Sequence, residues 1–217
     1  PGQTPPRIAR ANQVGLKDQL EYYGAKVGHD LIFDKQNARV VLPAGGGRRV
    51  FTNYPGFPVV TNFNKSNPIT RDMQGLIPIF PSSVELTKEV TAGKSGVTGE
   101  VLASSSDGSW RQTGFFLFDP LRQPKPTKEK GPFTLAVYAQ GTFKSFFAGR
   151  PVPKPGPAKP MQEQKETPKP DGKKSKASAR LVVVGDSDFV KDEYLGLNPA
   201  NLMLLLNMVD VLAQDTT

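Results

Sequence analysis

A segment rich in proline and lysine, residues 150–179, places the strongest limit on how this chain can fold. Proline, lysine, glutamine and glutamate dominate it, and it has almost no bulky apolar side chain. Burial therefore cannot offset the conformational entropy that is lost when such a segment becomes ordered. We expect a flexible or polyproline-like linker here. It divides the chain into a longer region, residues 1–149, and a closing region, residues 180–217.

Much of the positive charge of the chain lies in this linker. The formal net charge is +8 at pH 7. A protein that binds single-stranded nucleic acid needs aromatic side chains on which bases can stack, and no aromatic residue lies among the linker lysines. Nucleic acid is therefore not an expected partner. Contact of these lysines with anionic lipid headgroups is an alternative, and a solvated linker is the favoured interpretation.

The absence of cysteine and of long apolar runs from the sequence also excludes several kinds of site and segment. The chain has no cysteine, which excludes disulfides, zinc–thiolate sites and cysteine nucleophiles. No apolar run reaches the roughly 18 to 20 residues that span a bilayer. We expect a soluble fragment of a longer protein, with any signal peptide or membrane anchor outside it.

The closing region predicts an α/β layer. Residues 180–184 form a continuous apolar strand, and Asn198 and Pro199 supply the cap and first-turn proline of a helix at residues 200–213. That helix is apolar on nearly every side, so we expect it to be buried. A buried strand followed by a buried helix is typical of a parallel sheet that is covered on both faces.

The longer region has a different pattern, which indicates short, mostly antiparallel strands. An amphipathic helix is predicted before Gly24, which is a plausible stop signal. Several prolines favour edge strands and irregular loops over a regular central sheet. The helix is expected at residues 11–23, and extended segments at 25–34, 39–42, 48–53, 59–63, 76–86, 97–104 and 131–140, with 143–147 continuing the last layer.

The sharpest local motif is Gly-Asp-Ser-Asp-Phe at residues 185–189, where the closing strand ends. Such strand ends often hold ligand-binding residues in α/β proteins. A serine hydrolase would use Ser187 as nucleophile, but it needs a base, and the single histidine, His29, lies in a predicted strand. Asp186 and Asp188 could supply oxygen ligands to a divalent cation. The favoured alternative is a structural turn in which these aspartates bond nearby backbone amides.

Other polar and aromatic segments give weaker signals. Trp110 follows a polar loop and could stack on a sugar ring, although a single tryptophan is more often an anchor. The glycines and arginines at residues 45–49 lack the ending of a P-loop and predict a hairpin tip. No catalytic residue, cofactor or metal is expected. The candidate ligand-binding residues are Trp110, Asp186, Ser187 and Asp188.

Several short blocks of sequence follow one another along the chain in a specific order. They lie at residues 23–31, 79–86, 104–110, 132–147 and 180–189, and the helix at 201–213 completes the series. Each block is short, and it is their ordered combination that is specific. Taken together and in this order, they resemble the GldG-like auxiliary components of gliding-motility-type, uncharacterised ABC transport systems.

The resemblance implies an extracytoplasmic, periplasmic domain of a bacterial membrane protein, flanked by transmembrane segments outside this chain. It also implies an α/β fold related to the class I glutamine amidotransferases without their catalytic residues, here as a partial parallel-type sheet with an added β-rich region. The family normally has further strands before residue 23. It provides no defined functional residues.

The expected function is therefore non-enzymatic protein interaction within a transport or gliding-motility assembly. The expected partners are ABC permease and ATPase subunits. The alternative is a carbohydrate or cell-wall binding module, for which Trp110, Phe57 and Tyr54 are the aromatic candidates and an envelope glycan would be the ligand.

Overall fold

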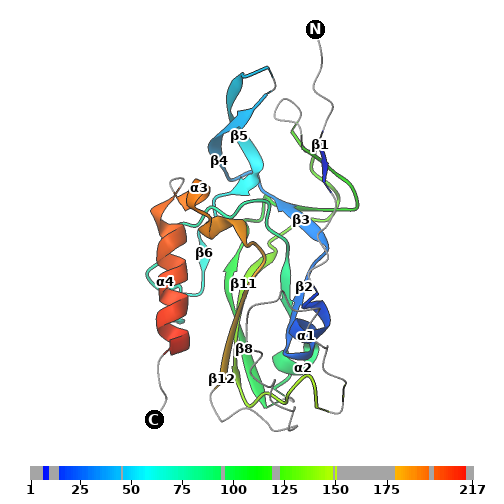
Figure 1. Ribbon diagram of the computed structural model, residues 1–217, viewed down its shortest axis with the longest axis vertical. Coiled ribbons are helices and arrows are strands. Elements are labelled where there is room, and N and C mark those ends of the chain that lie inside the picture. Colours follow the sequence, from blue (N-terminus) through cyan, green and yellow to red (C-terminus); the bar gives the residue numbers. More distant parts are fainter. Residues whose placement is uncertain are drawn as a thin grey trace, which may run out of the picture.

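The computed structural model describes residues 7–9, 15–44, 46–93, 96–118, 123–148, 150, 179–195 and 198–213. The predicted linker lies outside the described residues, apart from its two ends. Figure 1 shows an elongated mixed α/β arrangement in which strands form the centre and helices lie at its sides.

The helices and strands are short, except for β5 and α4. The first half contains β1 (Arg7–Ala9), α1 (Lys17–Tyr22), β2 (Ala25–Val27), β3 (Asp30–Phe33), β4 (Asn37–Pro43), β5 (Arg49–Pro58), β6 (Asn62–Phe63), β7 (Val84–Leu86) and α2 (Lys88–Thr91). The second half contains β8 (Val97–Ser104), β9 (Trp110–Thr113), β10 (Phe116–Phe118), β11 (Thr134–Gly141), β12 (Ala179–Val184), a 3-10 turn (Asp188–Val190), α3 (Asp192–Leu195) and α4 (Pro199–Ala213).

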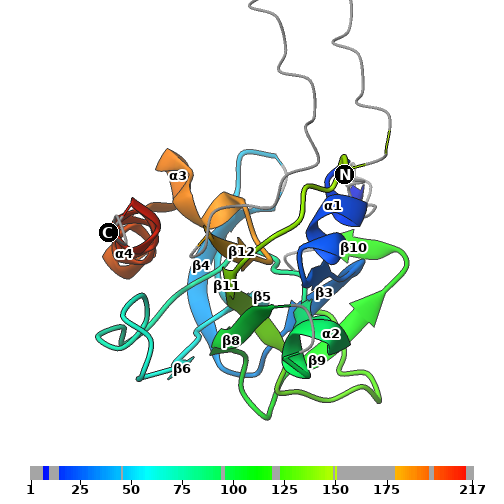
Figure 2. The ribbon, with the colours of Figure 1, turned by 90° about the horizontal axis from the view of Figure 1, so that it is seen from below.

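A four-stranded sheet in the order β12-β11-β8-β6 organises the core. Alternate residues of β11 point to opposite faces of this sheet, as strand geometry requires. Ala136 and Tyr138 face the cluster that includes Leu204 and Met208 of α4. Val137 faces a second cluster formed with Ala25 and Val84. The sheet is therefore covered on both faces, and Figure 2 shows α4 on one side and α1 on the other. Residues of β2 and β7 pack on the same side as α1.

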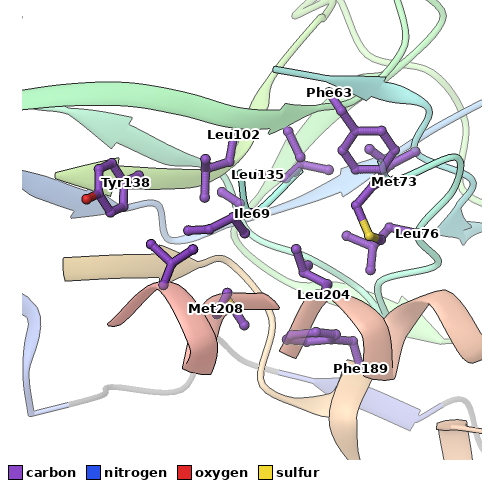
Figure 3. Close-up of a cluster of buried hydrophobic side chains, with 14 of the residues drawn as sticks. Phe63, Ile69, Met73, Leu76, Leu102, Leu135, Tyr138, Phe189, Leu204 and Met208 are labelled. Atoms are coloured by element: carbon purple, nitrogen blue, oxygen red, sulfur yellow. The ribbon is translucent and has the colours of Figure 1, made fainter. Parts of the chain in front are cut away.

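The largest hydrophobic cluster joins the two regions of the chain that the linker separates. Figure 3 shows Leu204, Met208 and Phe189 from the closing region against Leu102, Leu135 and Ile69 from the longer region. At roughly 25 cal/mol per Å² of buried apolar surface, such contacts are the main favourable term that holds both regions together. The closing region therefore completes the core of the longer region.

The remaining strands form two-stranded pairs, β1-β10, β2-β7, β3-β9 and β4-β5. Every strand pair among the described residues is antiparallel. The parallel pairing expected for residues 180–184 is thus not seen there: β12 pairs antiparallel with β11. The relation to the glutamine amidotransferase-like fold stays a prediction.

Several sequence predictions match the structure and others do not. β8 has the predicted bounds, and the Asn198 side chain caps α4 by accepting a hydrogen bond from the Ala200 amide at 3.0 Å. Gly24 has φ of +102°, which suits its predicted place after α1. Two predictions of extended structure, for residues 76–86 and 143–147, were wrong. Only Val84–Leu86 forms a strand in the first segment, and residues 146–148 form a turn after β11. Part of the predicted first helix, residues 11–14, lies outside the described residues.

The prediction that the last helix is buried was wrong for one of its faces. Asn201, Leu204, Met208 and Val211 of α4 are buried, whereas Leu206 is 53% exposed. The sheet can cover only one side of a helix, and the apolar sequence does not reveal which side that is. Among the described helices, none is long and apolar enough to cross a membrane.

Candidate functional site

The loop that follows β12 is held tightly against the segment before β7. Gly185 donates its backbone amide to the Leu135 carbonyl at 2.9 Å, and its own carbonyl accepts a hydrogen bond from the Ser82 amide at 2.7 Å. A Cβ atom at Gly185 would overlap the Ser82 carbonyl oxygen. Glycine is therefore required for this close approach of two backbones.

Asp186 uses both carboxylate oxygens to accept hydrogen bonds from backbone amides. Its Oδ2 accepts from Ile79 N at 2.6 Å, and its Oδ1 accepts from Asp188 N at 2.7 Å. Burial raises the pKa of Asp186 to about 6, although these amide hydrogen bonds oppose the shift. Burial disfavours the charged form, and this effect outweighs the hydrogen bonds that favour it.

Ser187 and Asp188 lie beside Asp186 in the same loop but take part in local contacts. The Ser187 hydroxyl donates to Asp188 Oδ1 at 3.3 Å, and Lys191 Nζ forms an ion pair with that oxygen at 2.7 Å. A serine nucleophile needs a base to accept its proton, and the partner seen here is the carboxylate of a salt bridge. Asp186 accepts hydrogen bonds from backbone amides, as the structural-turn interpretation predicted, although one of these amides is that of the distant Ile79. The Asp188 carboxylate instead contacts the side chains of Ser187 and Lys191.

Trp110 lies on a different element, β9, and is buried. Only 2% of its surface is exposed, and its ring stacks on Phe33 with 5.8 Å between ring centroids. Tyr54 and Phe57 are also buried, in a cluster with Ile79. The three aromatic residues that motivated the glycan interpretation therefore have no open ring face for a sugar.

A polar network that the sequence analysis missed surrounds the buried carboxylate of Asp30, which is 4% exposed. Arg111 Nε forms an ion pair with Asp30 Oδ2 at 2.9 Å. Ser83 donates its backbone amide and its hydroxyl to the same carboxylate at 2.9 and 2.7 Å. The Arg111 guanidinium also lies 4.8 Å from the centroid of the Phe133 ring. No sequence signal could link these residues, because β3, the residue before β7, and β9 are far apart along the chain.

This network lines an open depression of about 290 Å³. Glu85 and Glu129 add carboxylates at 3.3 and 3.8 Å from Arg111 nitrogens, so acidic partners already surround the guanidinium. An arginine whose charge is neutralised in this way is poorly suited to capture a further anion. We assign the network a structural role. The other residues that line the depression are Lys26, Gly28, His29 and Thr113.

The exposed face of α4 is the most unusual surface of the described residues. We call it the α4 stripe. Its residues are large, apolar and between 41% and 53% exposed. Asp210 is the single charged residue in the helix sequence. The α4 stripe consists of Leu202, Met203, Leu206, Val209 and Leu212.

Together these features define a mixed α/β domain with structural polar networks and an apolar helix face. Within the described parts of the chain, no group of three or more histidine, cysteine, aspartate or glutamate side chains could hold a metal ion. The family model described as an ABC-type uncharacterized transport system matches residues 1–213. The chain belongs to this family of auxiliary transport components. No curated protein and no solved structure matches it.

Proposed function

We propose that this chain is a non-catalytic interaction domain of an ABC transporter auxiliary subunit, and that the α4 stripe binds the permease. Membership of the transport family supports the general role. The exposed apolar face of α4 is the observation on which the binding role rests.

Leaving the α4 stripe in water is unfavourable, because the transfer of apolar surface out of water lowers the free energy. A helix that is apolar all round is normally buried on every side, and contiguous exposed apolar patches usually mark interaction sites. Leu206 and Val209 are 53% and 52% exposed and lie three positions apart, so they are neighbours on the helix surface. Covering the stripe with a partner would remove this apolar surface from water.

The family membership and the chemistry of the stripe favour the permease as its partner. An ABC transport system contains a membrane-embedded permease, whose helices are rich in apolar side chains. The α4 stripe has the same chemistry, with Asp210 as the single charged residue of the helix. The resemblance implies a periplasmic domain, and of the two expected subunits the permease is the one that such a domain can reach. The ATPase is then an indirect partner that is reached through the permease.

The contacts of the strand-end loop support a non-catalytic role. Asp186, whose pKa is raised to about 6, accepts hydrogen bonds from two backbone amides. The Ser187 hydroxyl faces Asp188, which already pairs with Lys191. The binding of a small ligand by these residues stays a prediction.

The finer features of the proposal follow from the resemblance to GldG-like components. The domain lies on the periplasmic side of a bacterial inner membrane and connects the transporter to an envelope structure or motility machine. The burial of Trp110, Tyr54 and Phe57 argues against the glycan-binding alternative.

Site-specific photo-crosslinking tests the proposal. A photoreactive amino acid replaces Leu206 in the protein, expressed from its own locus, and crosslinks formed in intact membranes are identified by mass spectrometry. The same replacement at Leu16 is the matched control, because Leu16 is 52% exposed and Leu206 is 53% exposed. Crosslinks to an ABC permease from position 206 and not from position 16 would support the proposal. Equal yields from both positions, or no transporter subunit from either, would reject it.

A further inference from the structure

The β4–β5 hairpin has a face whose side chains are all exposed. Its register pairs Arg39 with Asn53, Val41 with Phe51 and Pro43 with Arg49. Side chains of cross-strand partners share a face, and so do those two positions apart on one strand. The six residues of these pairs are all exposed. We call this surface the hairpin outer face.

The other face of the hairpin turns toward the protein. Val40 is 3% exposed and packs in the cluster that contains Tyr54 and Phe57. Thr52, the cross-strand partner of Val40, is half-buried. The apolar residues of the outer face are therefore additional to those that the core uses.

At the centre of the outer face an apolar pair lies between two arginines. Phe51 is 65% exposed and Val41 is 45% exposed. The Arg39 guanidinium carbon lies 5.9 Å from the centroid of the Phe51 ring, a distance at which a cation is attracted to the face of an aromatic ring. Arg49 lies toward the tip, beside the exposed Arg48.

The hairpin is also uniformly cationic. Residues 37–58 contain Arg39, Arg48 and Arg49 and no aspartate or glutamate. Arg111, by contrast, is accompanied by Asp30 and Glu85. Its charge is therefore complementary to an anionic surface.

We propose that the hairpin outer face binds the anionic phospholipid headgroups of a membrane. The planar guanidinium group of arginine binds phosphate oxygens with two parallel hydrogen bonds. Phe51 and Val41 enter the boundary between headgroups and acyl chains, where amphipathic surfaces bury their apolar side.

The shape of the molecule favours a membrane over an acidic protein as the partner. The β4–β5 hairpin projects from one end of the molecule, away from α1 and α2 (Figure 1). A projecting ribbon can lie along a plane without interference from the rest of the domain. The inference rests on the proposed function in one respect, since an auxiliary subunit of a transporter works beside a membrane.

Sedimentation of the 217-residue chain with lipid vesicles tests this inference. One set of vesicles is phosphatidylcholine alone, and the other contains phosphatidylglycerol as well. We expect binding to the second set only, weakening as salt is added. Because each basic residue near an anionic surface strengthens binding about fivefold, replacing Arg39, Arg48 and Arg49 with glutamine should weaken it on the order of 100-fold.

The linker lysines provide the matched control for charge. Replacing Lys173, Lys174 and Lys176 with glutamine removes the same number of positive charges outside the hairpin. If the hairpin binds the lipid, this variant should keep most of its affinity for the mixed vesicles. An equal loss in the two triple variants would overturn the inference, because it would show attraction to net charge alone.

Phe115 provides the matched control for apolar contact, since it is 71% exposed on another segment. Phe51→Ser should weaken vesicle binding about tenfold, because it removes an aromatic side chain that is partly buried in the bound state. Phe115→Ser should not weaken it. Phe51→Trp gives a second measurement in a folded hairpin. Its fluorescence should be quenched by brominated lipids, whereas that of Phe115→Trp and of the buried native Trp110 should not.

The possible outcomes separate this inference from the proposed function. Vesicle binding that needs the hairpin arginines, together with quenching at position 51, supports the inference whatever the crosslinking at Leu206 shows. The absence of binding to the mixed vesicles, or an unquenched tryptophan at position 51, overturns it. The cationic hairpin would then be assigned to an acidic protein partner, and the permease proposal would still stand or fall on its own crosslinks.

Discussion

The Asp186 carboxylate accepts a hydrogen bond of 2.6 Å from the backbone amide of Ile79, a residue 107 positions away in the chain. The bond fastens the loop after β12 to the irregular segment that precedes β7. The Ser82 amide, which bonds the Gly185 carbonyl at 2.7 Å, makes a second link between the same two segments. The Gly-Asp-Ser-Asp-Phe motif at residues 185–189 thus joins the closing region to the longer region.

The charge of Asp186 should make the stability of the fold depend on pH. Burial raises its pKa from 3.8 to about 6, so the folded protein keeps this proton at pH values where the unfolded chain has lost it. The contribution of the group is therefore fully present below the unfolded pKa and is lost as pH rises through the folded pKa. The free energy of unfolding should fall across this window by up to about 3 kcal/mol, relative to a variant with no titrating group here.

Urea unfolding of the wild type and of Asp186→Asn, at about pH 4.5 and about pH 7.5, measures this effect. The stability advantage of the wild type over the variant should be larger at the lower pH. Asp72→Asn is the control, because the Asp72 side chain is 82% exposed. If the difference between the wild type and Asp186→Asn is the same at both pH values, the raised pKa is not a property of the folded protein.

The close approach at Gly185 predicts a large effect of one added methyl group. Gly185→Ala places a Cβ against the Ser82 carbonyl oxygen, and two hydrogen-bonded backbones must move apart to admit it. We expect a loss of about 2 kcal/mol or more in the free energy of unfolding. Gly75→Ala is the matched control, because the nearest atom to its Cβ would be Asn198 Nδ2 at 3.9 Å. Equal melting temperatures for the two variants would show that the loop can shift freely.

Sequence reasoning succeeded where a local rule decides the structure. The pairing of Asn198 with Pro199 predicts the start of α4, and the run at residues 97–104 predicts β8, because capping and strand propensity act over a few residues. The place of Gly185 and Asp186 at the end of a strand was also predicted. The hydrogen bonds by which they join two distant segments depend on Ile79 and Ser82. No local pattern in the sequence connects these two residues to Gly185 and Asp186.

The failures share one cause, which is that tertiary contacts decide between local alternatives. The sequence left Trp110 open as an anchor or as a sugar-stacking residue, and only its stacking on Phe33, which lies far away in the sequence, favours the anchor. The apolar sequence of α4 is the same on its buried and exposed faces, so only the position of the sheet distinguishes Leu204 from Leu206. Residues 180–184 suit either a parallel or an antiparallel neighbour, and pairing with β11 selects the latter.

The buried amide of Asn201 predicts a further change in stability. Its Nδ2 donates to the carbonyls of Ile77 and Phe189 at 3.0 and 3.2 Å, and its Oδ1 accepts from the Ile77 amide at 3.0 Å. Asn201→Ala deprives three backbone groups of their partner and should cost about 3 kcal/mol. Asn207→Ala, which removes a single hydrogen bond to the Ile69 carbonyl at 3.0 Å, should cost about 1 kcal/mol. Urea unfolding of both variants measures the difference, and a loss at Asn201 no larger than that at Asn207 contradicts the prediction.

Breaking the ion pair between Asp30 and Arg111 should destabilise the fold far more than breaking an exposed pair does. Arg111→Ala leaves the Asp30 carboxylate, which is 4% exposed, without its 2.9 Å partner, and breaking a buried pair in this way costs about 3 kcal/mol. Arg71→Ala removes an exposed pair with Asp72 and should cost under about 1 kcal/mol. Adding Asp30→Asn to Arg111→Ala should recover part of the loss, since the amide does not bury a charge. If the loss in the double variant equals or exceeds the sum of the two single losses, the two side chains do not act as a pair and the depression they line is open to a different assignment.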